Sequence, residues 1–257
     1  MVEGITLLRS ALDAGAEVES VFVDVADGDS RSVAEVVARA HASGARTFSL
    51  APGVLRKVAD TVTPQPVLAV VHTPRWTLED LSGAGFVVVC VDVRDPGNAG
   101  AVIRTADAAG ADAVVCCAGT VDPYNPKTVR ASAGSVLHVP VVEAADPLAL
   151  LERLGGLGLR RWGTAARGGS PYTGVDLTAP CAVVLGNEAH GLPPSVRGLL
   201  DGMLTIPMAG RAESLNVAMA ASVLCFEVRR QRSSLPGMSS GAHQSMPGVR
   251  SPSEGAS

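Results

Sequence analysis

The chain has 257 residues, a formal net charge of −4 at pH 7 and a hydrophobic fraction of 47%. This length can bury a substantial core in one large domain or two modest ones without disulfides. The acidic balance gives no support to a nucleic-acid partner, because phosphate binding usually shows as an excess of Lys and Arg.

The five cysteines lie in apolar runs without metal or redox spacing, so we interpret them as reduced core residues. The first residues carry no basic segment leading into an apolar one, and no apolar run approaches about 18 residues. We therefore expect a cytoplasmic protein with no membrane partner and no metal. The cysteines are Cys90, Cys116, Cys117, Cys181 and Cys225.

Residues 1–72 are expected to form a compact α/β unit. Apolar periodicity predicts helices at 4–14, 32–43 and 54–60 and strands at 20–26, 45–50 and 66–73. Residues 73–85 are polar and rich in turn-forming residues, which indicates a linker.

From residue 86 a second unit alternates strands and helices. Strands are predicted at 86–93, 112–117, 136–143, 159–166, 181–186 and 203–207. Helices are predicted from Gly100, at 147–154 and 195–200, and from about Ser214 to Gln231. Continuous apolar strands between helices indicate a parallel sheet that is covered on both faces. Residues 232–257 are rich in Ser, Gly and Pro, so we expect a disordered tail.

Residues 95–115, DPGNAGAVIRTADAAGADAVV, look like a nucleotide-binding loop before a helix. The dinucleotide fingerprint needs G-x-G-x-x-G, however, and this spacing occurs nowhere in the chain. A nicotinamide-dependent oxidoreductase is therefore disfavoured. Asn98 and Arg104 remain as polar groups near the start of the helix and are candidate functional residues. The alternative is a structural role for both, with Asn98 capping the helix and Arg104 paired with Asp107.

A second cluster, VVLGNEAHGLPPSV at 183–196, places Gly186 at the end of a strand and Asn187, Glu188 and His190 in the turn that follows. Ligands of open α/β sheets bind at the carboxyl ends of strands, which is where these residues fall. A plain solvated turn is the alternative, and His190 alone favours a structural role.

Two further segments carry polar residues beside predicted elements. In LTIPMAGRAESLNVAMAASVLCFEVRR, Ser214 is a candidate helix cap, and Ala218 begins a face of small residues that would allow close approach of a ligand or another backbone. In PKTVRASAGSVLHVPV, Arg130 and Ser132 precede a strand. Arg130 could contact an anion or be merely solvated.

Together these segments resemble the SpoU (TrmH-like) family of the SPOUT class, S-adenosylmethionine-dependent RNA 2′-O-ribose methyltransferases. The resemblance rests on DVRDPGNAGAVIRTADAAGA, VVLGNEAHGL and LTIPMAGRAESLNVAMAASV, and its order and spacing hold across 86–231. The first 72 residues resemble the ribosomal-protein-like substrate-binding domain that often precedes the catalytic one. Family members usually have a basic segment before the position of Val2, so we expect either an abbreviated domain or a start further upstream.

The resemblance implies an α/β fold with a parallel sheet and a C-terminal trefoil knot, a homodimer, and turns at 185–191 and 206–216 that hold the cofactor. It implies that Arg104 stabilises the developing alkoxide, because a guanidinium is a poor base, with orientation by Asn98, Glu188, Ser214 and Asn216. It implies RNA contacts by Arg130 and Ser132. The implied cofactor-binding residues are Leu185, Gly186, Asn187, Ile206, Met208, Leu215, Asn216 and Ala218.

The substrate is left between two RNA classes. The N-terminal domain favours ribosomal RNA over transfer RNA, because domains of that kind commonly read structured RNA by shape. A non-catalytic RNA-binding protein on the same fold is the remaining alternative, and the presence of Arg104 and its predicted neighbours argues against it.

Overall fold

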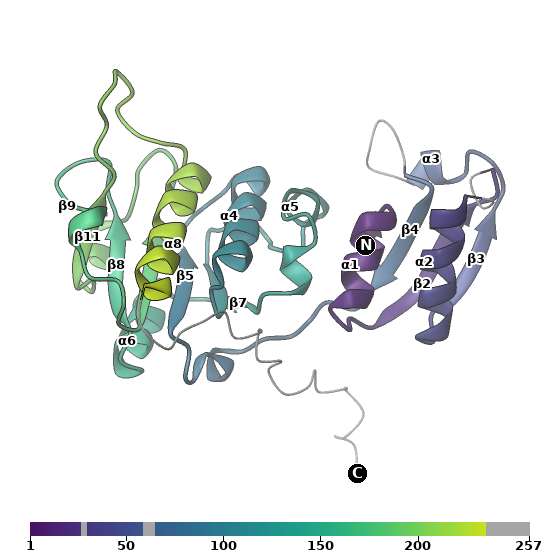
Figure 1. The fold of residues 1–257 in the computed structure, drawn as a ribbon, viewed down its shortest axis with the longest axis horizontal. Helices are drawn as coiled ribbons and strands as arrows, with labels where there is room; N and C mark the ends of the chain where they lie inside the picture. Colours follow the sequence, from purple (N-terminus) through teal and green to yellow (C-terminus); the bar gives the residue numbers. More distant parts are fainter. Residues whose placement is uncertain (27–29, 59–64, 235–257) are drawn as a thin grey trace, which may run out of the picture.

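Two β-sheets organise the computed structural model of the chain, which describes residues 1–26, 30–58 and 65–234 (Figure 1). The smaller sheet belongs to the N-terminal unit and the larger to the rest of the chain. The predicted division into two α/β units is therefore visible as two sheets with their own helices.

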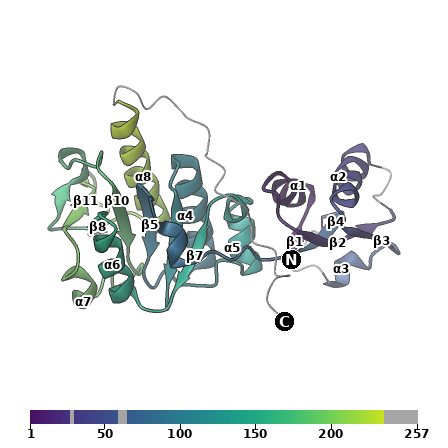
Figure 2. The same cartoon turned by 90° about the horizontal axis from the view of Figure 1, so that it is seen from below.

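The N-terminal sheet has four strands in the order β1-β4-β2-β3. Strand β2 is parallel to β3 and antiparallel to β4. Figure 2 shows α1 and α2 on one face of this sheet and the short α3 on the other. The elements are β1 (Val2–Glu3), α1 (Ile5–Asp13), β2 (Val18–Asp24), α2 (Arg31–Ala42), β3 (Arg46–Leu50), α3 (Leu55–Val58) and β4 (Val67–Val71).

The larger sheet has seven strands in the order β7-β6-β5-β10-β8-β11-β9, and every neighbouring pair is parallel. Its strands are β5 (Phe86–Cys90), β6 (Ala113–Cys117), β7 (Val141–Ala144), β8 (Arg160–Thr164), β9 (Ser170–Pro171), β10 (Cys181–Leu185) and β11 (Gly202–Thr205). Its helices are η1 (Leu78–Leu81), α4 (Pro96–Ala109), α5 (Pro126–Ala131), η2 (Ser135–Leu137), α6 (Pro147–Gly156), η3 (Tyr172–Gly174), α7 (Pro194–Arg197) and α8 (Val217–Ser233).

Both faces of the larger sheet are covered, which explains why its central strands are apolar at every position. Along β5, Val88 belongs to the core under α4 and α8, whereas Val87 and Val89 belong to the core under α6. Figure 2 shows α4 and α8 on one side of the sheet and α6 on the other. The prediction of a doubly covered parallel sheet is confirmed.

The two units meet at a packed junction. One continuous cluster of buried apolar residues includes Leu7 of α1 and Val129 of α5. Ser10 Oγ and His138 Nε2 are hydrogen-bonded at 2.7 Å. Gly134 lies against Ser10 with φ of 96°, and a side chain there would strike the Ser10 hydroxyl. The N-terminal sheet is therefore joined to the larger unit by direct contacts as well as by the connecting segment.

Several element boundaries differ from those predicted. Helix α4 begins at Pro96 rather than Gly100, because the Asp95 side chain accepts a hydrogen bond from the Asn98 amide and Pro96 occupies the first turn. The predicted strand at 136–143 is a short 3-10 helix followed by β7, with Pro140 between them. Pro140 cannot donate to a ladder, which accounts for the late start of β7.

The ends of the larger unit also differ from the prediction. The predicted linker contains η1 and a β-bridge from Trp76 to Val142, so it packs on the larger unit. Helix α8 begins at Val217 and continues to Ser233, two residues into the segment predicted as a tail. The rest of that prediction, 235–257, lies outside the described residues.

Candidate active site

A cavity of about 540 Å³ lies at the carboxyl ends of β8, β10 and β11, where ligands of parallel α/β sheets bind. Most of its wall comes from three segments: the end of β8, the turn after β10, and the long loop between β11 and α8; β11, α7 and α8 add further residues. The lining residues are Thr164–Arg167, Gly186–Gly191, Arg197, Leu204, Ile206, Met208, Ser214–Val217, Ala220 and Leu224.

Gly186 lies where the turn after β10 folds back on itself. A Cβ atom there would lie 2.5 Å from the carbonyl carbon of Gly191 and 2.6 Å from the amide nitrogen of Leu192. The turn is also closed by a hydrogen bond from the Gly191 amide to the Asn187 carbonyl, at 2.9 Å. Only glycine therefore allows this turn to form the edge of the cavity.

The Asn98 side chain joins the three predicted motifs. Its Nδ2 donates to Glu188 Oε1 at 2.9 Å, and its Oδ1 accepts from Asn216 Nδ2 at 2.9 Å. Asn98 belongs to α4, Glu188 to the turn after β10, and Asn216 to the start of α8. The structure thus brings together three of the five residues predicted to be catalytic.

Asn187 was predicted to contact the cofactor, but the hydrogen bonds of its side chain are made to residues of the turn and to Asp92. Its Nδ2 donates to the carbonyl and the carboxylate of Asp92, at 2.9 and 3.1 Å. Its Oδ1 accepts from the amides of Ala189 and His190. The same Asp92 carboxylate accepts from Arg94 at 2.7 Å and raises the pKa of that guanidinium. The side chain of Asn187 therefore holds the turn in shape.

Arg104 stands apart from this cluster. It is exposed in the interior of α4 rather than near its start, and it does not line the cavity. Its side chain has no hydrogen bond or ion pair within the described part of the chain, so the alternative pairing with Asp107 is not formed. The neighbouring Thr105 is hydrogen-bonded to Ser222 of α8 at 3.0 Å, which places this region of α4 against α8.

The capping residue of α8 is Asn216 rather than the predicted Ser214. Asn216 Oδ1 accepts a hydrogen bond from the Ala218 amide at 2.9 Å, as an N-cap side chain does. Ser214 lies two residues earlier, exposed on the cavity wall.

Two residues predicted to contact the cofactor lie off the cavity wall, and their contacts stay a prediction. Leu185 is fully buried in β10, and its carbonyl already accepts from the Val91 amide at 2.9 Å. Ala218 does not line the cavity, and its amide is satisfied by Asn216. By contrast, the cavity wall includes Gly186, Asn187, Ile206, Met208, Leu215 and Asn216.

Ser132, which was predicted to contact RNA, is buried in this structure. Ser132 is 0% exposed, and its hydroxyl donates to the Val129 carbonyl at 2.8 Å, so it caps a turn inside the protein. Arg130 is half-buried at the junction between the two units, beside Val58 and Leu68.

The cysteines behave as the sequence indicated. All five are buried and free. Burial raises the pKa of Cys117 and of Cys225 to about 12, so these thiols stay protonated at neutral pH. Over residues 1–26, 30–58 and 65–234 no cluster of three or more His, Cys, Asp or Glu side chains could hold a metal ion. Within the same ranges, no helix combines the length and the apolar character needed to cross a membrane.

Some cavity residues escaped the sequence interpretation. Thr164 ends β8 and Arg167 lies three residues beyond it, and β8 neighbours β10 in the sheet. Their position at the carboxyl end of a predicted strand was a usable signal, because adjacent parallel strands end at the same edge. Arg197 on α7 gave no such signal, since a short surface helix carries no pattern that points to a cavity.

The parallel sheet and the cavity at its carboxyl edge define an α/β protein with a candidate ligand site at the ends of its strands. The model of the SpoU rRNA Methylase family matches residues 85–226, and that of the MRM3-like substrate binding domain matches residues 1–69. The chain belongs to the SpoU rRNA methylase family and carries a separate N-terminal substrate-binding domain.

Individual relatives agree with this assignment. A 23S rRNA (guanosine(2553)-2′-O)-methyltransferase of Bacillus subtilis is 36% identical over 89% of this chain and 88% of its own. A 23S rRNA (uridine(2479)-2′-O)-methyltransferase of Streptomyces viridochromogenes is 34% identical over 72% of this chain and 67% of its own. The crystal structure of AviRb from Streptomyces viridochromogenes with AdoMet superposes with a TM-score of 0.82 at 31% identity, covering 91% of this chain and 90% of that one.

Proposed function

We propose that this protein transfers the methyl group of S-adenosylmethionine to a ribose 2′-hydroxyl of ribosomal RNA. The main support is the side-chain amide of Asn98, which links α4 to the two loops of the cavity by hydrogen bonds to Glu188 and Asn216. Among the relatives described above, the 23S rRNA methyltransferase of Bacillus subtilis supports the proposal, because the similarity covers 89% of this chain.

The cavity fits the proposed cofactor. A volume of about 540 Å³ lies within the range of small-molecule sites. Ile206, Met208 and Leu215 offer apolar surface to an adenine ring, and the closely folded turn at Gly186 offers backbone groups. S-adenosylmethionine supplies an activated methyl group when bound. It has no phosphate, so the absence of a Gly-rich phosphate loop from the sequence is consistent with it.

Arg104 is proposed to act on the RNA. An exposed guanidinium that has no partner among the described residues is available to stabilise negative charge as it develops on the ribose oxygen. An adjacent RNA phosphate is the proposed acceptor of the hydroxyl proton, because arginine holds its own proton at neutral pH. Glu188, Asn98, Asn216 and Ser214 would position the two loops and the ribose around this reaction.

The proposal extends to the organisation of the chain. Residues 1–72 would bind the RNA, 73–85 would connect, and 86–231 would carry the methyl transfer in the cytoplasm. The loops at 185–191 and 206–216 would be the loops of a trefoil knot. In support, both loops line one cavity, and α8 follows directly from the second.

The test is incorporation of label from S-adenosylmethionine into purified RNA. We expect wild-type protein to label unmodified 23S rRNA at one ribose and to leave transfer RNA unlabelled. Arg104→Ala should lower the rate by about 100-fold or more, as expected for removal of one charge-stabilising donor, with cofactor affinity by calorimetry unchanged.

Arg160→Ala is the matched control, because Arg160 is equally exposed but lies at the opposite end of β8 from the cavity. Wild-type turnover by Arg104→Ala would remove Arg104 from the mechanism. Label in neither RNA class would contradict the proposed activity, and label in transfer RNA alone would replace the proposed substrate.

A further inference from the structure

Two of the four phenylalanines of this chain are stacked on one another at the protein surface. The rings of Phe22 and Phe48 have centroids 5.3 Å apart and planes 17° apart. Phe48 is 43% exposed. Aromatic residues make up only 3% of the sequence, and yet two of its four phenylalanines form a pair that is incompletely buried.

The pair lies on the open face of the N-terminal sheet. Strand pairing puts Leu68, Phe22 and Phe48 in one row across β4, β2 and β3, so their side chains share a face. The alternating residues Val21 and Val23 are buried on the opposite face, which α1 and α2 cover (Figure 2). Strand β3 is the edge of the sheet, and its residues are exposed from Arg46 to Ser49.

Basic side chains flank the pair on this face. Arg46 lies two residues before Phe48 on β3 and is 66% exposed, with one ion pair to Glu19 at 2.7 Å. Arg56 and Lys57 belong to α3, the helix on the same side of the sheet (Figure 2). This face therefore combines aromatic surface with positive charge in a chain that is acidic overall.

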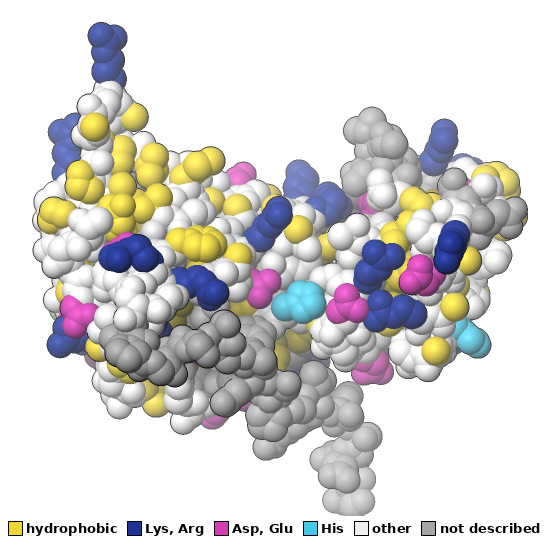
Figure 3. Space-filling model, in the orientation of Figure 1, with side chains coloured by type: hydrophobic (Ala, Val, Ile, Leu, Met, Phe, Trp, Pro, Cys, Tyr) yellow, Lys and Arg dark blue, Asp and Glu magenta, His cyan; other side chains and the backbone are white. Residues whose placement is uncertain are grey.

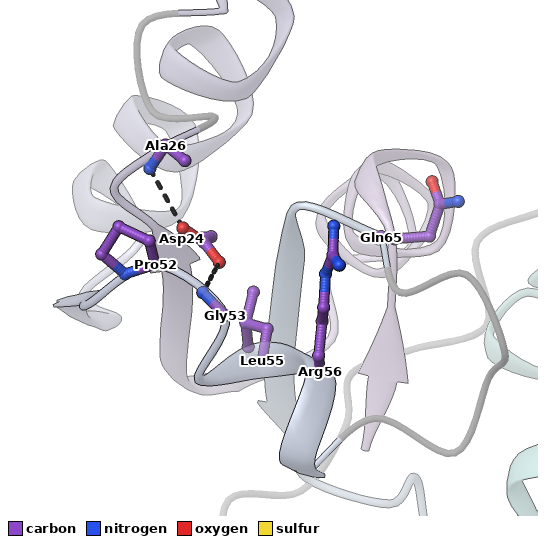
Figure 4. Close-up of a pocket in the computed structure, with 7 residues that line it drawn as sticks. All are labelled: Asp24, Ala26, Pro52, Gly53, Leu55, Arg56 and Gln65. Carbon is purple, nitrogen blue, oxygen red and sulfur yellow. Dashed lines mark hydrogen bonds between the residues drawn. The ribbon is translucent and has the colours of Figure 1, made fainter.

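A cavity of about 430 Å³ opens at the carboxyl ends of the same two strands (Figure 4). Asp24 at its centre accepts hydrogen bonds from the amides of Ala26 and Gly53, both at 3.0 Å. These bonds lower the pKa of Asp24, with a smaller contribution from the charge of Arg56. An ionised carboxylate repels phosphate but can accept hydrogen bonds from amino groups, such as those on the edges of nucleobases.

We infer that the stacked Phe22–Phe48 pair is a platform for an unpaired base of the substrate RNA, whose neighbouring nucleotides lie along Arg46 and the cavity at Asp24. The inference rests on the proposed function. Sequence-specific RNA recognition commonly splays single-stranded bases onto aromatic side chains, and basic residues beside them contact the backbone.

The charges on this face favour RNA over a second copy of the chain. Two copies meeting through the face in a symmetric pair would bring Arg46, Arg56 and Lys57 close to their equivalents, which costs free energy. RNA phosphates would instead neutralise these cations, and an RNA base would cover the exposed Phe48 ring.

The test compares binding of a fluorescently labelled single-stranded oligoribonucleotide with binding of a duplex of the same length, by anisotropy at fixed salt. Phe48→Ala should weaken binding of the single strand by about tenfold or more, as for loss of one base–aromatic stack, and leave duplex binding unchanged. Phe48→Tyr should bind as wild type does, because the ring is retained. Leu157→Ala is the matched control, since Leu157 is 38% exposed on the larger unit.

Each result decides the question. Unchanged single-strand affinity in Phe48→Ala, or no single-strand binding by wild type, overturns the inference. A change in oligomeric state by light scattering without a change in RNA affinity assigns the face to a second copy. An unfolding midpoint and a circular dichroism spectrum equal to those of wild type show that Phe48→Ala is folded. If wild type methylates no RNA while Phe48→Ala still loses the single strand, the proposed function fails and the platform stands.

Discussion

At the scale of single residues, the site depends on what one amide can do that other side chains cannot. Asn98 donates to Glu188 and accepts from Asn216 at the same time. A carboxylate in its place could not donate, and an apolar residue could do neither. The partners lie 90 and 118 residues away along the chain, so this residue converts sequence-distant segments into one site.

Gly186 gives a prediction about cofactor binding. Gly186→Ala should push the turn after β10 away from Gly191, because the new Cβ would lie 2.5 Å from its carbonyl carbon. We expect a loss of unfolding free energy of about 1–3 kcal/mol, the usual cost of overpacking. Titration calorimetry should show affinity for S-adenosylmethionine reduced by about tenfold or more, equivalent to about 1.4 kcal/mol.

The matched control is Gly210→Ala in the other loop of the site. Among the described residues, nothing lies within 4 Å of a Cβ built on Gly210, so affinity should stay at the wild-type value. Equal affinity in the two variants would show that the turn at Gly186 is not the edge that holds the cofactor.

At the scale of elements, α8 is fixed at its far end by its last turn. Arg232 Nη2 donates to the carbonyls of Gly85 and Ala179, at 2.9 and 2.8 Å, and its Nε donates to Leu177 at 3.2 Å. Its guanidinium also lies 5.5 Å from the centroid of the Phe86 ring. The helix that begins at the cavity therefore ends on the segments that enter β5 and β10.

Arg232→Lys tests this anchor. A lysine ammonium is a single point on a flexible stem and cannot reproduce the planar fork that reaches three carbonyls. We expect the free energy of unfolding in urea to fall by about 1.5–3 kcal/mol, the range for hydrogen bonds to a charged group. Arg229→Lys, at an exposed position of the same helix, should unfold like wild type. Equal midpoints for both variants would contradict the anchor.

The elements also show how far the sequence could be interpreted. Long apolar strands such as β5, β6 and β10 were predictable, because a fully buried parallel strand is apolar at every position. Short elements such as β1, β9 and α5 were not, since two to six residues carry no periodicity. The anchor at Arg232 was missed because its partners are backbone carbonyls. Every residue has such a group, so the sequence does not show which ones accept a hydrogen bond.

Some residues of the site could also be predicted from the sequence, and others could not. The glycine turn, Glu188, Asn98 and Asn216 could be chosen from motifs, and the structure brings them together. The burial of Ser132 could not be predicted, because it depends on how α5 packs against the rest of the unit. The role of Arg104 stays a prediction.

At the scale of the whole molecule, one face of α8 is left without a partner in the described chain. Met219 is 63% exposed and Phe226 is 48% exposed, and they lie seven residues apart on one side of the helix. Hydrophobic side chains gather over this part of the larger unit in Figure 3. We propose that a second copy of the chain covers this face and forms a homodimer beside the cavity.

Phe226→Glu should disrupt that dimer, because a carboxylate buried at an apolar interface without a partner is strongly unfavourable. Light scattering should give the mass of one chain, about half that of wild type, and methylation should be lost. Leu157→Glu, at a similarly exposed apolar position away from α8, should keep the dimer. A wild-type monomer that methylates RNA would refute the dimer.

The packed junction between the two units has a consequence for target choice. Leu7, Val129 and the Ser10–His138 contact hold the N-terminal sheet against α5 and η2. The distance between the two units is therefore fixed, and an RNA that contacts both must span that distance. If the first unit binds RNA as proposed, the choice of nucleotide depends on its distance from the part of the RNA that this unit contacts.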